Sequence, residues 1–291
     1  MIGDDRVTTP EDLIVPDTAD TQPLDYALPG LREILVALLI SAILVIGISL
    51  WVGKTQKFNG DEYRYVMQAE NPLAILMPPH GLRILTPRLA WLIPVDLRQG
   101  FYIITLLSMT GTVALAYILL RTIGCTIPIS ATALSVLLLH RGIHESLFHY
   151  PLVDSLSFLL IELGILATLL QRDRLFSLSL TLGVLNRETS LFLIPFYHFA
   201  RSQKPFSLRA LAATALVCSG GIIALILTRS VLLSLSDRAY LVDHVQQFYP
   251  TLSSGFGRFD RFYLAEFREI ISNTERMKEI LSLRTFTAGF G

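Results

Sequence analysis

The stretch from residue 34 to residue 52, ILVALLISAILVIGISLWV, decides the class of this protein. It contains no charged residue, and as a helix rising about 1.5 Å per residue it matches the hydrocarbon core of a bilayer. Trp51 and then Lys54 close it, an aromatic ring and a cation of the kind that anchor a helix at the membrane interface. We therefore predict that residues 34–52 cross a membrane.

The composition of the whole chain agrees with this prediction. Of 291 residues, 52% are hydrophobic and only 16% are charged, whereas soluble domains average about 25% charged residues. The 24 Lys and Arg balance the 24 Asp and Glu, so the net charge gives no reason to expect a nucleic-acid partner. The composition excludes most soluble enzymes and predicts an all-α, polytopic transmembrane helical bundle.

Further apolar segments extend the pattern to about seven spans, some of them short. The six that follow the first cover residues 99–120, 122–139, 151–170, 175–185, 189–200 and 210–228. We predict a transmembrane domain over residues 31–228, with a juxtamembrane helical first outer loop at 53–98. Gly220-Gly221 in the last span favours close helix contact.

Residues 175–200 admit two topologies, because Arg187 and Glu188 divide an apolar run into pieces of about half a span each. One continuous helix would place both charges near the bilayer centre and would separate the basic residues on either side of the run. A hairpin of two short helices puts both basic clusters on one side. The positive-inside rule favours the hairpin and a cytoplasmic N-terminus.

The two ends of the chain are predicted to lie on opposite sides of the membrane. Residues 1–30 are acidic and rich in Pro and Thr, which is typical of a disordered cytoplasmic tail. Residues 229–291 are predicted to be an extracytoplasmic segment with an amphipathic helix over 261–283, through which a membrane-protein partner would bind. The chain ends without a terminal span, so we expect it to belong to a longer protein.

The predicted topology collects polar residues from four separate segments on the outer side. They are Asp61, Glu62, Arg64, His80, Arg83, Arg88, His140, Arg141, His144, Glu145, His149, Asp154, Arg187 and Glu188. Lipid-facing surfaces cannot host such residues, so their convergence at one end of a bundle predicts a functional site.

Most of these residues also have a purely structural interpretation. Asp61 and Glu62 would serve equally as a solvated cap at the start of a short helix. Each arginine would serve as an interfacial residue whose charged head reaches water. Arg187 and Glu188 would alternatively form a mutual ion pair that stabilises the hairpin tip.

The histidines before residue 150 raise the question of a metal. His140 and His144, four residues apart, would share one face of a helix. Their spacing is not that of a zinc protease, and Gly142 together with Tyr150-Pro151 favours a loop with hydrogen-bonding or substrate-contacting histidines. We assign no metal ligands and leave a divalent cation open as a cofactor.

Three short motifs together resemble the GT-C superfamily of membrane glycosyltransferases, over roughly residues 31–228. They are Asp61 with Tyr63 after the first span, Arg-x-Leu-x-Pro at residues 83–87, and Arg-Glu-Thr at residues 187–189. The resemblance implies an integral membrane enzyme that transfers a sugar from a polyprenyl-phosphate donor to an acceptor on the extracytoplasmic side. It implies Asp61 as the acid/base or acceptor-orienting residue, and a lipid-linked sugar and membrane lipids as partners.

The chemistry of such a transfer can be stated from the reaction itself. Positive charge develops on the sugar and negative charge on the departing phosphate, so the site needs a carboxylate near the acceptor hydroxyl and a cation at the phosphate. Asp61 and Glu62 are the catalytic candidates. The substrate-binding candidates are Arg83, Arg88, Arg141, His144, Asp154, Arg187 and Glu188.

Two other classes of function stay open on the sequence. Glu162 near the middle of a span, together with the short paired helices of residues 175–200, suits a transporter or lipid-handling protein. A non-catalytic scaffold subunit would use residues 229–291 to bind its partner.

Overall fold

The computed structural model describes residues 26–55, 61–70, 83–202 and 204–235, and all regular structure within these ranges is helical. In chain order the helices are α1 (Leu31–Val52), α2 (Asp61–Glu70), α3 (Leu85–Leu92), α4 (Leu97–Thr122), α5 (Ile127–Leu139), α6 (Arg141–Phe148), α7 (Asp154–Leu169), α8 (Asp173–Asn186), the 3₁₀-helix η3 (Glu188–Phe192), α9 (Leu193–Arg201) and α10 (Leu208–Leu235). The predicted all-α class is confirmed for the described residues. The predicted acidic tail and amphipathic helix lie outside them.

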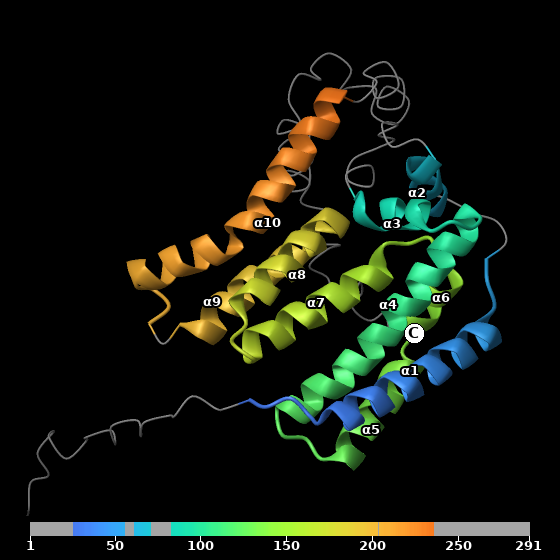
Figure 1. Ribbon diagram of the computed structural model, residues 1–291, viewed down its shortest axis with the longest axis horizontal. Helices are drawn as coiled ribbons and strands as arrows, with labels where there is room; N and C mark the ends of the chain where they lie inside the picture. The colour runs from blue at the N-terminus through green and yellow to red at the C-terminus, as the bar shows by residue number, and fades with distance from the viewer. Residues whose placement is uncertain (1–25, 56–60, 71–82, 203, 236–291) are drawn as a thin grey trace, which may run out of the picture.

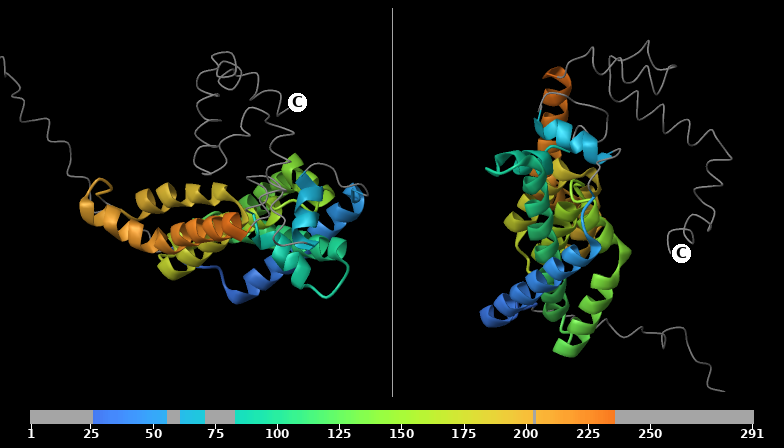
Figure 2. Two further views of the ribbon diagram at one scale, coloured as in Figure 1. Left: turned by 90° about the horizontal axis from the view of Figure 1, so that it is seen from above. Right: turned by 90° about the vertical axis from the view of Figure 1, so that its right-hand side faces the viewer.

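The longer helices lie side by side in a row (Figure 1). Helix α1 packs on α4, α4 on α7, α7 on α8, and α8 on α10. Helix α6 packs on α1, α4 and α5, and α5 packs on α4, while α2 and α3 cover one end of α4. Figures 1 and 2 show α2, α3 and the C-terminal end of α10 at the same end of the molecule, which we call the α2–α3 end.

Three helices are long and apolar enough to cross a membrane, namely α1, α4 and residues Leu208–Val231 of α10. A multi-pass membrane protein is therefore consistent with the described residues, but about seven spans are not supported. Helices α5, α7, α8 and α9 have 13, 16, 14 and 9 residues. Even the 16-residue helix covers only about 24 Å of a core about 30 Å thick.

Residues 122–139 were predicted to form one membrane span, but a turn at their start makes the helix shorter than predicted. The chain leaves α4 through Gly124, whose φ of 91° is a left-handed conformation that favours glycine. Helix α5 begins only at Ile127, with a proline in its first turn where the missing N–H costs little. The start of this helix was therefore predicted five residues too early.

Residues 175–200 form the predicted hairpin rather than one continuous helix. Helix α8 ends at Asn186, Arg187 adopts an extended conformation (φ −159°, ψ 134°), and η3 begins at Glu188. At the other end of the hairpin, Arg201 of α9 reaches Asp173 of α8, with 3.6 Å between Nη2 and Oδ1. The basic residues before α8 and after α9 therefore lie at the same end of the molecule.

Small residues allow the helices of the row to approach closely. A Cβ atom placed on Gly221 of α10 would lie 2.9 Å from Cγ of Leu180 on α8, which is too close for an unshifted contact. Leu180 is fully buried with Phe176 and Tyr197 in a cluster shared by α7, α8, α9 and α10. The predicted close helix contact at Gly220-Gly221 is thus confirmed at Gly221.

The two outer-loop predictions had different outcomes. Residues 61–70 form the predicted short helix, α2, whose Tyr65 packs with Phe101 of α4 and Tyr150 before α7. The segment after His140 was predicted to be a loop, which is wrong, because residues 141–148 form helix α6. His140 caps this helix, its Nδ1 accepting a hydrogen bond of 3.0 Å from the Gly142 N–H.

Candidate functional site

The tip of the α8–η3 hairpin is tied by ion pairs to three other parts of the chain. Glu188 Oε2 lies 3.2 Å from Nε of Arg83, which precedes α3, and its Oε1 lies 3.2 Å from Nη2 of Arg229 on α10. Arg187 pairs with Asp154 at the start of α7. The two tip residues therefore hold different neighbouring elements together.

Arg83 is held by a phenol as well as by a carboxylate. Its Nη1 donates a hydrogen bond of 2.9 Å to the Tyr65 hydroxyl on α2, and only 14% of its side chain is exposed. Burial by itself would lower the pKa of Arg83, but the neighbouring Tyr65 and Glu188 raise it above its ordinary value. The guanidinium is therefore charged and fixed in position.

Asn186 fixes the backbone at the hairpin tip through four hydrogen bonds. Its Oδ1 accepts from the backbone N–H and the hydroxyl of Thr86 at 3.2 and 2.6 Å. Its Nδ2 donates to the Val153 carbonyl at 2.8 Å and to the Ser157 hydroxyl at 2.9 Å. The fully buried amide thus joins α3 and α7 to the end of α8.

A carboxylate and an imidazole form a second polar pair at the α2–α3 end. Glu62 Oε1 lies 2.6 Å from Nδ1 of His149, which caps the C-terminus of α6. The Glu62 side chain is 6% exposed, whereas that of His149 is 40% exposed. A buried carboxylate thus orients a half-exposed imidazole, an arrangement that enzymes use for general acid–base chemistry.

The contacts around the hairpin tip and the Glu62–His149 pair meet on α2, where Glu62 and Tyr65 lie one turn apart. We call the combined set the polar cluster. Its members are Glu62, Tyr65, Arg83, His149, Asp154, Asn186, Arg187, Glu188 and Arg229. Four segments predicted to converge at one end of the bundle therefore do so.

Two predicted substrate-binding residues have other local partners. Arg141 pairs with Glu145 one turn along α6 at 2.6 Å, and both side chains are largely exposed. The ring of His144 packs edge-on against Trp51, with 5.5 Å between ring centroids, and its Nε2 lies 2.9 Å from the Leu138 carbonyl oxygen. These contacts join α6 to α5 and to the end of α1.

The structure describes the side chain of Arg88 but not those of Asp61 and His80. Arg88 on α3 is half-buried, and its side chain makes no hydrogen bond or ion pair within the described part of the chain. Burial lowers its pKa from the ordinary value. The side chain of Asp61, although its backbone begins α2, and the whole of His80 lie outside the described residues.

The described ranges contain neither a metal site nor a hydrogen-bond partner for Oε2 of Glu162. No group of three His, Cys, Asp or Glu side chains within them could hold a metal ion. Oε2 of Glu162, the acid predicted near the middle of a span, is buried and finds no hydrogen-bond partner among those residues.

Sequence reasoning missed several members of the polar cluster. Asn186, Tyr65 and Arg229 were not selected, and His149 was noted only as one of the outer histidines. Asn186 immediately precedes Arg187 within an apolar run, and Arg229 is the first charge after the last predicted span. A charged or amide residue at such a boundary is the signal that would have selected both.

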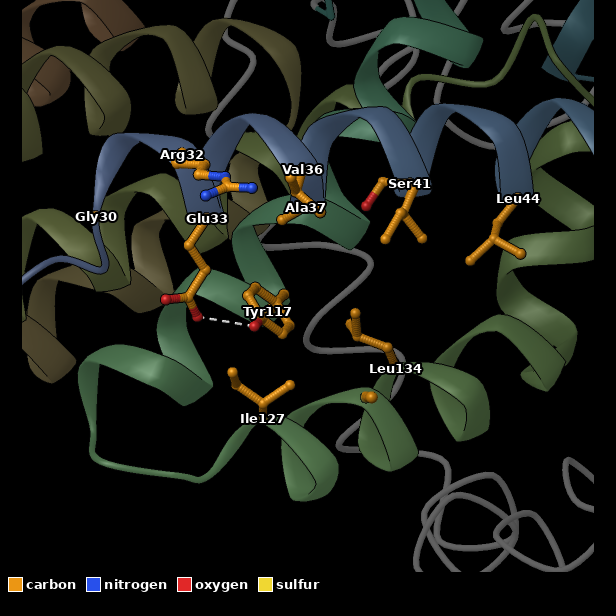
Figure 3. A pocket seen from close by; sticks show the side chains of 12 residues that line it. Gly30, Arg32, Glu33, Val36, Ala37, Ser41, Leu44, Tyr117, Ile127 and Leu134 are labelled. Atoms are coloured by element: carbon orange, nitrogen blue, oxygen red, sulfur yellow. Dashed lines mark hydrogen bonds between the residues drawn. The ribbon is translucent and has the colours of Figure 1, made fainter.

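A groove of about 550 Å³ lies elsewhere, between α1, α4 and α5 (Figure 3). Apolar side chains such as Val36, Ile127 and Leu134 line most of it. At its mouth the Tyr117 hydroxyl donates a hydrogen bond of 2.8 Å to Glu33 Oε1. The groove begins beside the N-terminus of α1, at the opposite end of that helix from the polar cluster.

Comparison of the chain with models of protein families, with curated proteins and with solved structures finds no match. Function must therefore be inferred from the residues of the polar cluster and their geometry.

Proposed function

We propose that this chain is an integral membrane glycosyltransferase that takes a sugar from a polyprenyl-phosphate donor and transfers it to an acceptor on the extracytoplasmic side. The observation that carries the proposal is the polar cluster, in which an oriented imidazole and a fixed guanidinium lie at one end of a bundle of membrane helices. The proposal places the α2–α3 end outside and the basic ends of α8 and α9 in the cytoplasm.

The phosphate of the donor would be held by arginine. Arg83 is already fixed by Tyr65 and Glu188, so binding an anion costs it little further loss of side-chain freedom. Arg88, five residues further along, brings a second guanidinium that has no partner among the described residues. A guanidinium presents paired N–H donors that match phosphate oxygens.

The acceptor hydroxyl would be activated by one of two groups. Asp61 is the candidate that the family resemblance implies. The second is His149, whose Nδ1 is held by Glu62 so that Nε2 is left for the acceptor. In this role Nε2 takes the hydroxyl proton while the acceptor oxygen bonds to the anomeric carbon. The bond from that carbon to the phosphate oxygen breaks, and the phosphate leaves with the electron pair.

The experiment is a transfer assay with membranes that contain the full chain and a polyprenyl-phosphate carrying a radiolabelled hexose. Wild-type membranes should move label from the carrier into a product that no longer extracts with the lipid donor. Asp61→Asn should abolish the transfer, and Arg141→Gln should leave it unchanged because the ion pair of Arg141 in the described part of the chain is with Glu145, within α6. Full activity of Asp61→Asn at normal expression would overturn the assignment of that residue.

Two further variants separate the roles of the acid–base candidates. If His149 is the base, His149→Gln should lower kcat by about 100-fold or more, the usual size of a general-base contribution. Glu62→Gln should then lower kcat less and shift the pH profile, since it acts through the imidazole. Unchanged kcat in both variants would leave Asp61 as the base and refute the role of His149.

A transporter is the second candidate, and Glu162 is the observation that favours it. A buried carboxyl oxygen without a hydrogen-bond partner in a membrane-embedded helix is a common feature of ion-coupling sites. In liposomes, proton-coupled substrate flux should be lost in Glu162→Gln. Flux that is insensitive to this change would exclude the transporter role for Glu162.

A further inference from the structure

A polar cavity lies at the end of the molecule opposite the polar cluster. It has a volume of about 570 Å³ and is bounded by α8, α9, the α9–α10 connection and α10. Arg201, Lys204 and Arg209 line it, against one carboxylate, Asp173. Figure 1 shows these elements meeting where α9 ends and α10 begins.

The walls of this cavity are fixed by hydrogen bonds. His198, which is buried, is within 2.8 Å of the Thr214 hydroxyl through Nδ1 and of the Pro205 carbonyl oxygen through Nε2. These contacts hold the α9–α10 connection against α10. The Tyr197 hydroxyl donates to Asp173 at 2.8 Å, which holds α9 against α8. The cavity is therefore part of the folded structure and does not depend on the cations that line it.

The cavity has the chemistry of a phosphate site. Lys204 and Arg209 have no ion pair among the described residues, whereas Arg201 forms one long ion pair there, with Asp173. Helix α10 begins here, and Ser207 caps it by accepting a hydrogen bond of 3.2 Å from the Ala210 N–H. The positive end of a long helix dipole thus adds to the cationic charges.

The surroundings of the cavity favour a lipid as the source of the phosphate. The cavity wall continues along α10 as Ala213, Leu216 and Val217, within a helix that is long and apolar enough to cross a membrane. Phe206 and Leu208 beside it are 89% and 83% exposed, as expected of side chains that enter the interface of a bilayer. A headgroup in the cavity would therefore leave its acyl chains against α10.

We propose that this cavity, between α8, α9 and the start of α10, binds the phosphate headgroup of an anionic phospholipid from the leaflet at that end. The basic residues of a cytoplasmic loop need only face water to satisfy the positive-inside rule. Lys204 and Arg209 instead line a preformed cavity with hydroxyl groups and a helix N-terminus, which is the composition of a headgroup site between membrane helices. The bound lipid would hold α9 and α10 together.

The test is native mass spectrometry of the full chain in micelles that contain phosphatidylglycerol or phosphatidylcholine. Wild type should retain one phosphatidylglycerol and should not retain phosphatidylcholine. Lys204→Gln/Arg209→Gln should weaken phosphatidylglycerol binding about thirtyfold, because each cation near an anionic headgroup contributes about fivefold and the two factors multiply. Lys204→Gln alone should weaken it by several-fold. Both residues are exposed, so in micelles free of anionic lipid the variants should unfold at the wild-type temperature.

A charge-matched control is Arg32→Gln/Arg141→Gln, which removes two cations outside the cavity. Equal loss of phosphatidylglycerol in this control, unchanged binding in the cavity variant, or equal retention of phosphatidylcholine would each overturn the proposal. Excess inorganic phosphate should not displace the lipid from wild type. Complete displacement would identify a site for free phosphate and would refute the lipid as its occupant.

Discussion

At the scale of single residues, the Asn186 side chain joins the hairpin tip to α3 and to the start of α7. Its amide makes four hydrogen bonds to three residues while it is itself fully buried. A buried amide of this kind fixes one arrangement of the backbone, because every alternative would leave donors and acceptors unpaired. The positions of Arg187 and Glu188, and so of their ion pairs, depend on it.

We predict that Asn186→Leu lowers the free energy of unfolding by about 2–4 kcal/mol, since several buried polar groups would lose their partners. Thermal or chemical unfolding in micelles, followed by circular dichroism, would measure the loss. Ser135→Ala removes one exposed hydrogen bond to the Ala131 carbonyl and should change stability little. Equal stability of Asn186→Leu and wild type would contradict the role given to the amide.

A second prediction compares two glutamates that both bind arginine. Glu188→Gln removes the carboxylate shared by Arg83 and Arg229 and should cost about 1–3 kcal/mol, because its partners are largely buried. Glu145→Gln breaks an exposed pair within α6 and should cost about 0.5 kcal/mol or less. Unfolding of the two variants under identical conditions checks the order, and a larger loss for Glu145→Gln would contradict it.

At the scale of helices, the hairpin shows what the sequence could predict. The charges at Arg187 and Glu188 cannot lie at the bilayer centre, so the positive-inside rule sufficed to predict a turn there. That residues 141–148 form a helix, α6, could not be predicted in the same way. Gly142 weakens helix propensity, but the His140 cap and the contact of His144 with Trp51 stabilise the helix through parts of the chain that a local pattern does not include.

The same limit applies to the candidate site. Topology alone brought Arg83, Asp154 and Glu188 to one end, because each follows or precedes a helix that ends there. Which face of a short helix points toward the cluster depends on packing, so Arg141 and His144 were selected although they make other contacts. Asn186 carries no charge, so the pattern of charged residues did not indicate it.

Two adjacent glycines of α10 provide a matched test of helix contact. Gly221→Ala should destabilise the protein by about 1–3 kcal/mol, because its Cβ would lie 2.9 Å from Leu180 Cγ. Gly220→Ala should be neutral or slightly stabilising, since its nearest side-chain atoms would be 3.5 Å away and alanine favours the helix. Unfolding in micelles measures both, and an equal effect of the two variants would argue against close packing of α8 and α10.

At the scale of the whole molecule, the proposed sidedness follows from where the charges lie. The polar cluster lies at the α2–α3 end, and the cavity lined by Lys204 and Arg209 lies at the opposite end of the molecule. A single cysteine introduced at Glu145 should therefore react with an impermeant maleimide added outside intact cells, in a background lacking Cys125 and Cys218. One introduced at Lys204 should react only after permeabilisation. The reverse pattern would invert the topology and place the polar cluster in the cytoplasm.

The most direct test of the central claim is sugar transfer measured separately on the two sides of the membrane. Right-side-out and inverted vesicles containing the full chain would receive a radiolabelled polyprenyl-phosphate hexose together with isolated cell-envelope acceptor. We predict transfer in right-side-out vesicles, its loss in Asp61→Asn, and little transfer in inverted vesicles. Absence of transfer by the wild-type chain in both preparations, or equal transfer in both, would contradict an extracytoplasmic glycosyltransferase.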